Sequence, residues 1–115
     1  IMTEIIKPTM VDYTRHLLVC VGEHCSDNNA GQALYDQLKD KFKESGLNEG
    51  ALRVKRSRAS CFGTCKSGPL ICVQPDGVWY YDVTSEKLDR IIKEHLLGGA
   101  PVTDYIYHQG PGATI

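Results

Sequence analysis

The sequence predicts an α/β fold in which a four-stranded mixed sheet packs against two main helices. Short apolar runs at 16–22 and 70–73 are typical of buried strands. The segment 30–45 carries apolar residues at helical spacing. The turn at 74–77, which contains a proline and a glycine, joins two apolar runs as a hairpin would. The elements therefore follow in the order strand–helix–strand and then strand–strand–helix.

The first half of the chain predicts a strand–helix–strand unit. The strand at 16–22 ends in glycine, which places Cys20 near its carboxyl end. After a polar, turn-like segment, the helix at about 30–45 presents an apolar stripe of Ala30, Ala33, Leu34, Leu38 and Phe42. The second strand is expected at Leu52–Lys55, parallel to the first because a helix connects them.

The second half predicts a hairpin and a closing helix. The run at 70–73 pairs with an antiparallel strand at 78–81. Thr84 or Ser85 is expected to cap the last helix. Its buried face should consist of Leu88, Ile91, Ile92 and Leu96.

Length and composition predict one globular domain. We expect residues 1–14 to form an N-terminal arm, residues 15–109 the domain, and residues 110–115 a mobile tail. The formal net charge of −1 gives no global field that would attract nucleic acid or an anionic membrane. No apolar run approaches the ~20 residues that a membrane helix needs. Five cysteines without an export signal indicate a reducing compartment, the cytoplasm.

Two close pairs of cysteines predict a metal centre. Cys20 and Cys25 are separated by four residues, Cys61 and Cys65 by three, and thirty-five residues lie between the pairs. Four thiolates that converge on one site can hold zinc, copper(I) or an iron–sulfur cluster. The spacing alone leaves an iron–sulfur cluster and a structural four-cysteine zinc site, as in a protein-interaction module, equally open.

The order of the elements is that of a thioredoxin-like fold, and the proline before the third strand agrees with it. A thioredoxin itself needs Cys-x-x-Cys between its first strand and first helix. This chain has a wider cysteine gap at that position. A dithiol oxidoreductase is therefore a weaker alternative.

The cysteine pattern is similar to that of the thioredoxin-like [2Fe-2S] ferredoxins, and to the related small [2Fe-2S] subunit of NADH dehydrogenase. The resemblance covers roughly residues 17–107 and is closer to the free-standing bacterial ferredoxins. Besides the four cysteines, the motifs that carry it are Gly68-Pro69, Pro75-Asp76-Gly77-Val78-Trp79-Tyr80, Lys93-Glu94-His95-Leu96, Gly98-Gly99 and Pro101-Val102. Some relatives have a longer gap between the first two cysteines, so the first ligand loop can differ in shape.

The resemblance implies that Cys20, Cys25, Cys61 and Cys65 hold one [2Fe-2S] cluster per chain. It further implies a one-electron carrier, not an enzyme, that shuttles electrons between redox proteins, and a homodimer. No residue is predicted to be catalytic, and no nucleic acid or membrane partner is expected.

Other candidate residues have simpler interpretations. Cys72 lies inside an apolar strand, and we interpret it as a buried small hydrophobe rather than a fifth ligand. The four histidines show no paired metal spacing. Arg56, Arg58 and Lys66 flank the second cysteine pair and form either a solvated edge or a docking surface for an acidic redox partner.

Overall fold

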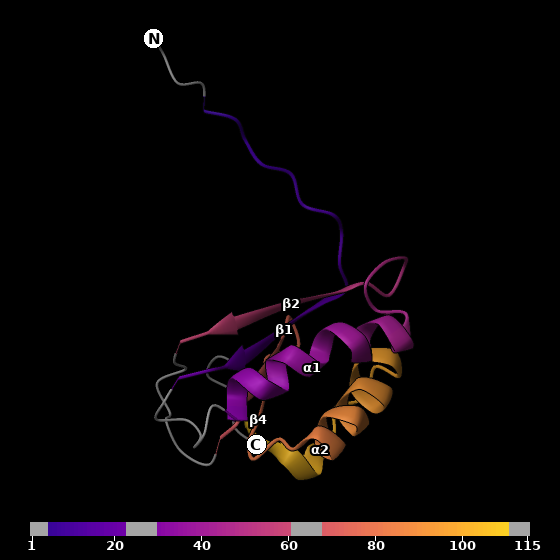
Figure 1. The fold of residues 1–115 in the computed structure, drawn as a ribbon. Helices are drawn as coiled ribbons and strands as arrows, with labels where there is room; N and C mark the ends of the chain where they lie inside the picture. Colours follow the sequence, from indigo (N-terminus) through magenta and orange to yellow (C-terminus); the bar gives the residue numbers. More distant parts are fainter. Residues whose placement is uncertain (1–4, 23–29, 61–67, 111–115) are drawn as a thin grey trace.

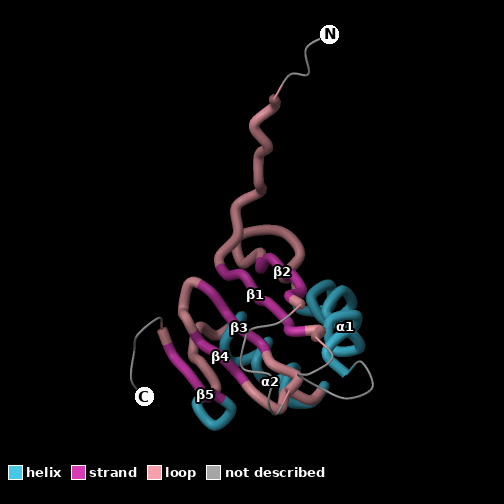
Figure 2. Tube along the Cα trace, turned by 90° about the vertical axis from the view of Figure 1, so that its left-hand side faces the viewer, coloured by secondary structure: helices cyan, strands magenta, loops and turns pink. Residues whose placement is uncertain are grey.

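A computed structural model describes residues 5–22, 30–60 and 68–110 of the chain. Within these ranges, five strands form one mixed sheet of order β2-β1-β3-β4-β5. Figure 1 shows the whole fold, and Figure 2 labels all the strands. The strands are β1 (Arg15–Cys20), β2 (Val54–Ala59), β3 (Ile71–Gln74), β4 (Val78–Tyr80) and β5 (Ile106–Gln109). β1 and β2 are parallel, and the other neighbours are antiparallel. The predicted mixed sheet is therefore present, with one strand more than predicted.

The helices follow the predicted order. α1 (Ala30–Ser45) connects the parallel strands, and α2 (Ser85–Arg90) continues into the π-helical η1 (Ile91–Leu97). A 3-10 turn, η2 (Thr103–Tyr105), precedes β5. Thr84 caps α2, because its hydroxyl accepts a hydrogen bond of 3.2 Å from the backbone N–H of Lys87.

Two predictions about strands were wrong. No pattern in the sequence indicated β5, which pairs with β4 from Val78↔Gln109 to Tyr80↔Ile106. The second strand begins at Val54 and runs to Ala59, whereas Leu52–Lys55 was predicted. β2 lies at the edge of the sheet, where a strand tolerates charged side chains. Its residues after Val54 are mostly polar or charged, so no hydrophobic pattern indicated that the strand continues to Ala59.

The core lies on one face of the sheet. Both helices pack on this face in Figure 1. Figure 2, turned by 90°, shows the sheet from its face without helices, in front of α2. The core joins Leu17, Val19, Ile71, Val73, Val78 and Tyr80 of the sheet to Leu34, Leu38 and Phe42 of α1 and Leu88, Ile91, Ile92 and Leu96 of the last helix. Each such side chain contributes about 1.5–3 kcal/mol when fully buried. The predicted buried face of the last helix is confirmed, whereas Ala33 of the predicted α1 stripe is exposed and Gly31 is buried instead.

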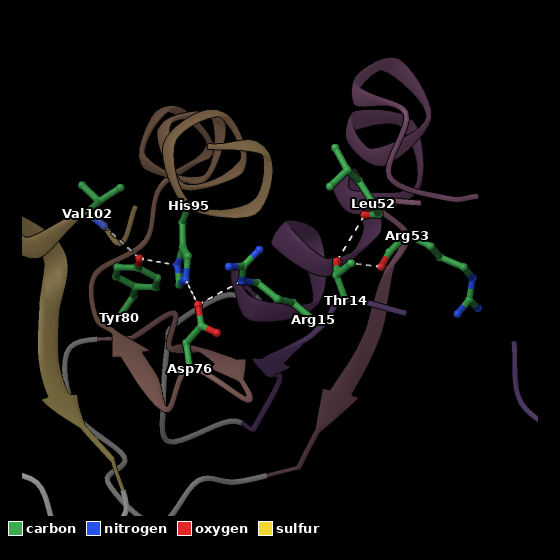
Figure 3. Close-up of polar contacts among 8 residues, drawn as sticks. All are labelled: Thr14, Arg15, Leu52, Arg53, Asp76, Tyr80, His95 and Val102. Atoms are coloured by element: carbon green, nitrogen blue, oxygen red, sulfur yellow. Dashed lines mark hydrogen bonds and ion pairs between the residues drawn. The ribbon is translucent and has the colours of Figure 1, made fainter. Parts of the chain in front are cut away.

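A chain of polar contacts, buried at Tyr80 and His95 and reaching the surface at Asp76, ties the last helix to the hairpin (Figure 3). The Val102 N–H donates to the Tyr80 hydroxyl over 3.0 Å, and the same hydroxyl lies 2.7 Å from His95 Nδ1. His95 Nε2 contacts the Asp76 carboxylate, which also accepts from Arg15 Nε at 2.9 Å. This chain lies on the helix side of the sheet, since Tyr80 and His95 are both fully buried there.

The N-terminal segment 5–13 has no regular secondary structure, is exposed, and extends away from the sheet (Figure 1). At its base, the Thr14 N–H donates to the Arg53 carbonyl over 2.7 Å. The Thr14 hydroxyl donates to the same carbonyl over 3.0 Å (Figure 3). These bonds fix the point at which the arm joins β1.

Candidate metal centre

Of the four predicted ligands, Cys20 is the one that the structure describes. It is the last residue of β1 and is fully buried, and it forms no disulfide. Cys25, Cys61 and Cys65 lie outside the described residues, as does Lys66. The geometry of the site is therefore built from Cys20 and from the backbone that leads into and out of the two cysteine segments.

The ends of β1 and β2 bring together the two points of the described backbone after which these segments begin. Cys20 lies opposite Ala59 in the parallel ladder, and the Val21 N–H donates to the Ala59 carbonyl over 2.8 Å. One residue further on, a Cβ at Gly22 would lie 2.1 Å from the Ser60 carbonyl oxygen and 3.8 Å from the Cys20 sulfur. Only glycine allows this backbone approach. Both cysteine segments therefore leave the sheet at one place.

The start of α1 lies against the same point. A Cβ at Gly31 would lie 2.2 Å from the Cys20 carbonyl oxygen, so the first turn of the helix packs directly on the end of β1. The first turn carries no acidic side chain. The positive end of the helix dipole, which stabilises nearby negative charge, therefore lies at the Cys20 end of β1.

Cys20 points to the sheet face without helices. Side chains alternate along a strand, and Leu17 and Val19 belong to the core, so Cys20 lies on the opposite face. There it forms a small buried cluster with Leu70, and the half-buried Tyr107 packs against that pair. The Cys20 N–H also donates to the Leu70 carbonyl over 3.0 Å. The geometry thus surrounds a thiol with apolar groups at the meeting point of two strands and a helix.

This arrangement suits a thiolate-bound metal. Iron–sulfur clusters take Cys thiolates, and an apolar shell limits the access of water to them. The absence of a Cβ at Gly22 leaves space beside the sulfur. The environment of Cys20 therefore fits a cluster ligand.

Cys72 differs from Cys20 in its surroundings. It is buried within β3, and Gln74 Nε2 donates to its sulfur over 3.2 Å. Burial raises the pKa of the Cys72 thiol to about 11, although the hydrogen bond from Gln74 opposes the shift. Such a thiol stays protonated at neutral pH, which supports its interpretation as a small hydrophobe.

The two described basic residues of the predicted docking surface lie beside α1. Arg56 Nη1 donates to Asn48 Oδ1 over 2.9 Å, and its guanidinium lies over the Phe42 ring. Arg58 is exposed, and its Nη1 donates to Gln32 Oε1 over 3.0 Å. Arg58 lies opposite Val19, one residue from the Cys20 end of the sheet. It is therefore the better placed of the two for a partner that approaches the candidate centre.

The other candidates add no metal ligands within the described ranges. No group of three or more His, Cys, Asp or Glu side chains there could bind a metal ion. The His16 ring contacts the Ser57 hydroxyl at 2.8 Å, and His95 belongs to the chain of polar contacts. His24 lies outside the described residues. In the same ranges no helix is long and apolar enough to cross a membrane.

Sequence reasoning missed three residues of the site. Gly31 interrupts a predicted helix near its start, which is a signal of close packing that could have been used. Gly22 ends the first predicted strand, but its contact with Ser60 depends on the ladder register. Tyr107 was missed because it lies on β5.

Comparison with known proteins places these features in a family. A family model described as thioredoxin-like [2Fe-2S] ferredoxin matches residues 11–96. A 2Fe-2S ferredoxin of Aquifex aeolicus (strain VF5) is 44% identical over 101 residues, which cover 84% of this chain and 91% of that protein. A 2Fe-2S ferredoxin of Clostridium pasteurianum is 31% identical over 99 residues, which cover 81% of this chain and 95% of that protein.

The fold has a solved counterpart. The crystal structure of the wild-type thioredoxin-like [2Fe-2S] ferredoxin from Aquifex aeolicus matches with a TM-score of 0.73 and 26% identity. The match covers 85% of this chain and 100% of that chain. The predicted thioredoxin-like fold class is therefore confirmed.

Proposed function

This chain belongs to the thioredoxin-like [2Fe-2S] ferredoxin family, and from that premise we propose that it is a one-electron carrier between redox proteins. In this proposal Cys20, Cys25, Cys61 and Cys65 hold its single [2Fe-2S] cluster. The observation that carries the proposal is the buried Cys20 thiol at the point where β1, β2 and the start of α1 meet.

Chain connectivity supports the ligand set. Cys61 directly follows Ser60, Cys25 comes three residues after Gly22, and Cys65 comes three residues before Gly68. Since a chain spans at most ~3.6 Å per residue, these short separations leave little chain between each cysteine and the described backbone. Four thiolates are the number that a [2Fe-2S] cluster requires.

When bound, such a cluster supplies one-electron chemistry between total charges of about −2 and −3, thiolates included. The residues of this chain provide the electrostatic and apolar surroundings of the cluster. The first turn of α1 directs its positive end toward the Cys20 end of β1. Leu70 and Tyr107 supply apolar surface on the other side. We propose no chemistry on an organic substrate.

The proposal includes a docking surface of Arg56, Arg58 and Lys66 for an acidic redox partner. The exposure of Arg58 and its place near the Cys20 end of β2 support this. Because basic side chains steer an acidic protein, docking would bring the partner to the cluster end of the sheet. The cysteine chemistry of a reducing compartment supports the cytoplasm as its location.

We also propose a homodimer. The sheet face without helices carries Trp79, Tyr81 and Tyr107 near β4 and β5, and Tyr81 is 40% exposed. A second copy would cover such aromatic surface. Light scattering at micromolar concentration should give twice the chain mass of 12.8 kDa. A monomer at that concentration would exclude the dimer.

Metal analysis of cysteine variants tests the ligand set. The wild-type protein should be red-brown and contain about two iron and two acid-labile sulfide ions per chain. Replacing any one of Cys20, Cys25, Cys61 or Cys65 with alanine should abolish the native cluster, because each removes one iron–thiolate bond. Cys72→Ser is the matched control and should keep the native spectrum. Loss of the cluster in Cys72→Ser, with retention in Cys20→Ala, would show that the ligand set is wrong.

A further inference from the structure

Tyr107 occupies a position that the carrier function does not by itself explain. It lies on β5, at the far edge of the sheet from β2, yet it packs against the pair formed by Cys20 and Leu70. This pair is separate from the main core. An aromatic side chain from the last strand therefore reaches the surroundings of a predicted ligand on the first.

The contact of Tyr107 with Cys20 and Leu70 lies on the sheet face without helices. The helices pack on the opposite face of the sheet (Figure 2), whereas Cys20 belongs to a cluster separate from the main core. Cys20 is nevertheless fully buried and Leu70 is 1% exposed. Among the described residues, Tyr107 is the aromatic side chain that packs on this pair.

Tyr107 lies between two residues of β5 that are paired with β4, Ile106 and His108. The Tyr81 N–H donates to the Tyr105 carbonyl over 3.1 Å, and Tyr80 lies opposite Ile106. Trp79 lies opposite His108 and Tyr80 opposite Ile106, so the register shift leaves Tyr107 as the extra residue of a bulge, at which β5 bends. The Tyr107 ring then meets the Tyr81 ring edge-on, with centroids 6.3 Å apart. Tyr107 therefore lies in a strand whose backbone is hydrogen-bonded to its neighbours, and not in a free loop.

We infer that Tyr107 is a positioning residue for the cluster, whose ring keeps water away from the Cys20 ligand and thereby lowers the reduction potential. The inference rests on the proposed function. Reduction adds one negative charge to the cluster, and water stabilises the more negative state better than an apolar shell does. Removing the ring should therefore raise the potential.

Spectroelectrochemical titration of the cluster-loaded protein tests this inference. Tyr107→Ala should shift the midpoint potential to a more positive value and speed the loss of the visible spectrum to an iron chelator. Tyr107→Phe keeps the ring and should stay close to wild type in both measurements. If Tyr107→Ala fails to retain a cluster, Tyr107→Leu replaces it, with a smaller positive shift expected.

Tyr105→Ala is the matched control. Tyr105 is also half-buried in the same tail, but it packs against the main core and lies beside Lys87 and Arg90. Its removal should lower thermal stability without moving the potential. Equal potentials in wild type and in the Ala or Leu variant at 107, or equal shifts in Tyr107→Phe and Tyr107→Ala, would overturn the inference. A wild-type protein without a cluster would instead remove the proposed function.

Discussion

His95 Nδ1 lies 2.7 Å from the Tyr80 hydroxyl, in a hydrogen bond between two fully buried side chains. The Asp76 carboxylate only accepts, so the neutral ring carries its proton on Nε2, and the Tyr80 hydroxyl, which accepts from the Val102 N–H, donates to Nδ1. His95 is then the neutral tautomer with its proton on Nε2, which donates to Asp76. Burial lowers the pKa of His95 although Asp76 acts in the opposite direction, and burial raises the pKa of Tyr80 to about 12.

Tyr80→Phe should destabilise the fold without changing the visible spectrum. It leaves the Val102 N–H and His95 Nδ1 unpartnered in the interior, at a cost of roughly 1–3 kcal/mol each. Thermal unfolding followed by circular dichroism measures the loss. Tyr105→Phe is the control, because the hydroxyl of this half-buried residue accepts only a long bond of 3.3 Å from Arg90 among the described residues. A Tyr80→Phe variant as stable as this control would show that the chain of polar contacts contributes little.

Stability should decrease as the pH falls below about 6.5, the ordinary pKa of histidine. In that range the unfolded chain binds a proton at His95, whereas the folded protein, with its lowered pKa, does not. His16 acts in the same direction, since burial first and Lys55 second lower its pKa. Above this range neither histidine contributes a slope.

Unfolding temperatures between pH 7.5 and 5.5 check the pH dependence. His95→Gln should be less stable at pH 7.5 but should show a flatter pH profile than wild type. Identical slopes in the two proteins would mean that His95 does not cause the dependence. Asp76 does not contribute to the pH dependence between pH 7.5 and 5.5, because its pKa is lowered below the ordinary value of 3.8. Burial alone would raise that pKa, but the hydrogen bonds from His95 and Arg15 outweigh it.

Gly31→Ala should impair the cluster site, although alanine normally stabilises a helix by about 1 kcal/mol relative to glycine. The added methyl group would lie 2.2 Å from the Cys20 carbonyl oxygen, so α1 must move away from β1. The expected results are a lower unfolding temperature and a lower iron content after reconstitution. Lys39→Ala, at an exposed position of the same helix, should leave both unchanged. A stabilised Gly31→Ala variant with a full cluster would contradict this packing.

Charge reversal at Arg58 and Lys66 should slow reduction by an acidic reductase and leave the visible spectrum intact. Electrostatic steering acts on the association rate, and it fades as salt shortens the screening length to ~10 Å at 0.1 M. The double variant with glutamate at both positions should therefore be slow at low salt and close to wild type at high salt. Lys39→Glu with Lys93→Glu is the control of equal charge change at two other exposed sites. Equal rates in both double variants would place docking on another face.

The sequence predicted those parts of the fold that have a local pattern. The α1 stripe from Leu34 to Phe42 and the cap at Thr84 follow from helical spacing and side-chain chemistry. β5 has no such pattern, because its four residues are held by Val78–Tyr80 rather than by a local turn. The chain of polar contacts from Arg15 to His95 joins residues far apart in sequence, so no spacing could indicate it. For the same reason, the cysteine spacing indicated a metal centre but not the contribution of Tyr107.

Anaerobic reductive titration followed by electron paramagnetic resonance tests the central claim most directly. A single [2Fe-2S] cluster on four cysteines should take up one electron per chain, lose part of its visible colour, and give a spin-½ signal of about one spin per two iron ions. This signal should be absent from Cys20→Ala and present in Cys72→Ser. A colourless protein with stoichiometric zinc, or uptake of two electrons with the release of two thiols, would contradict the assignment as a one-electron carrier.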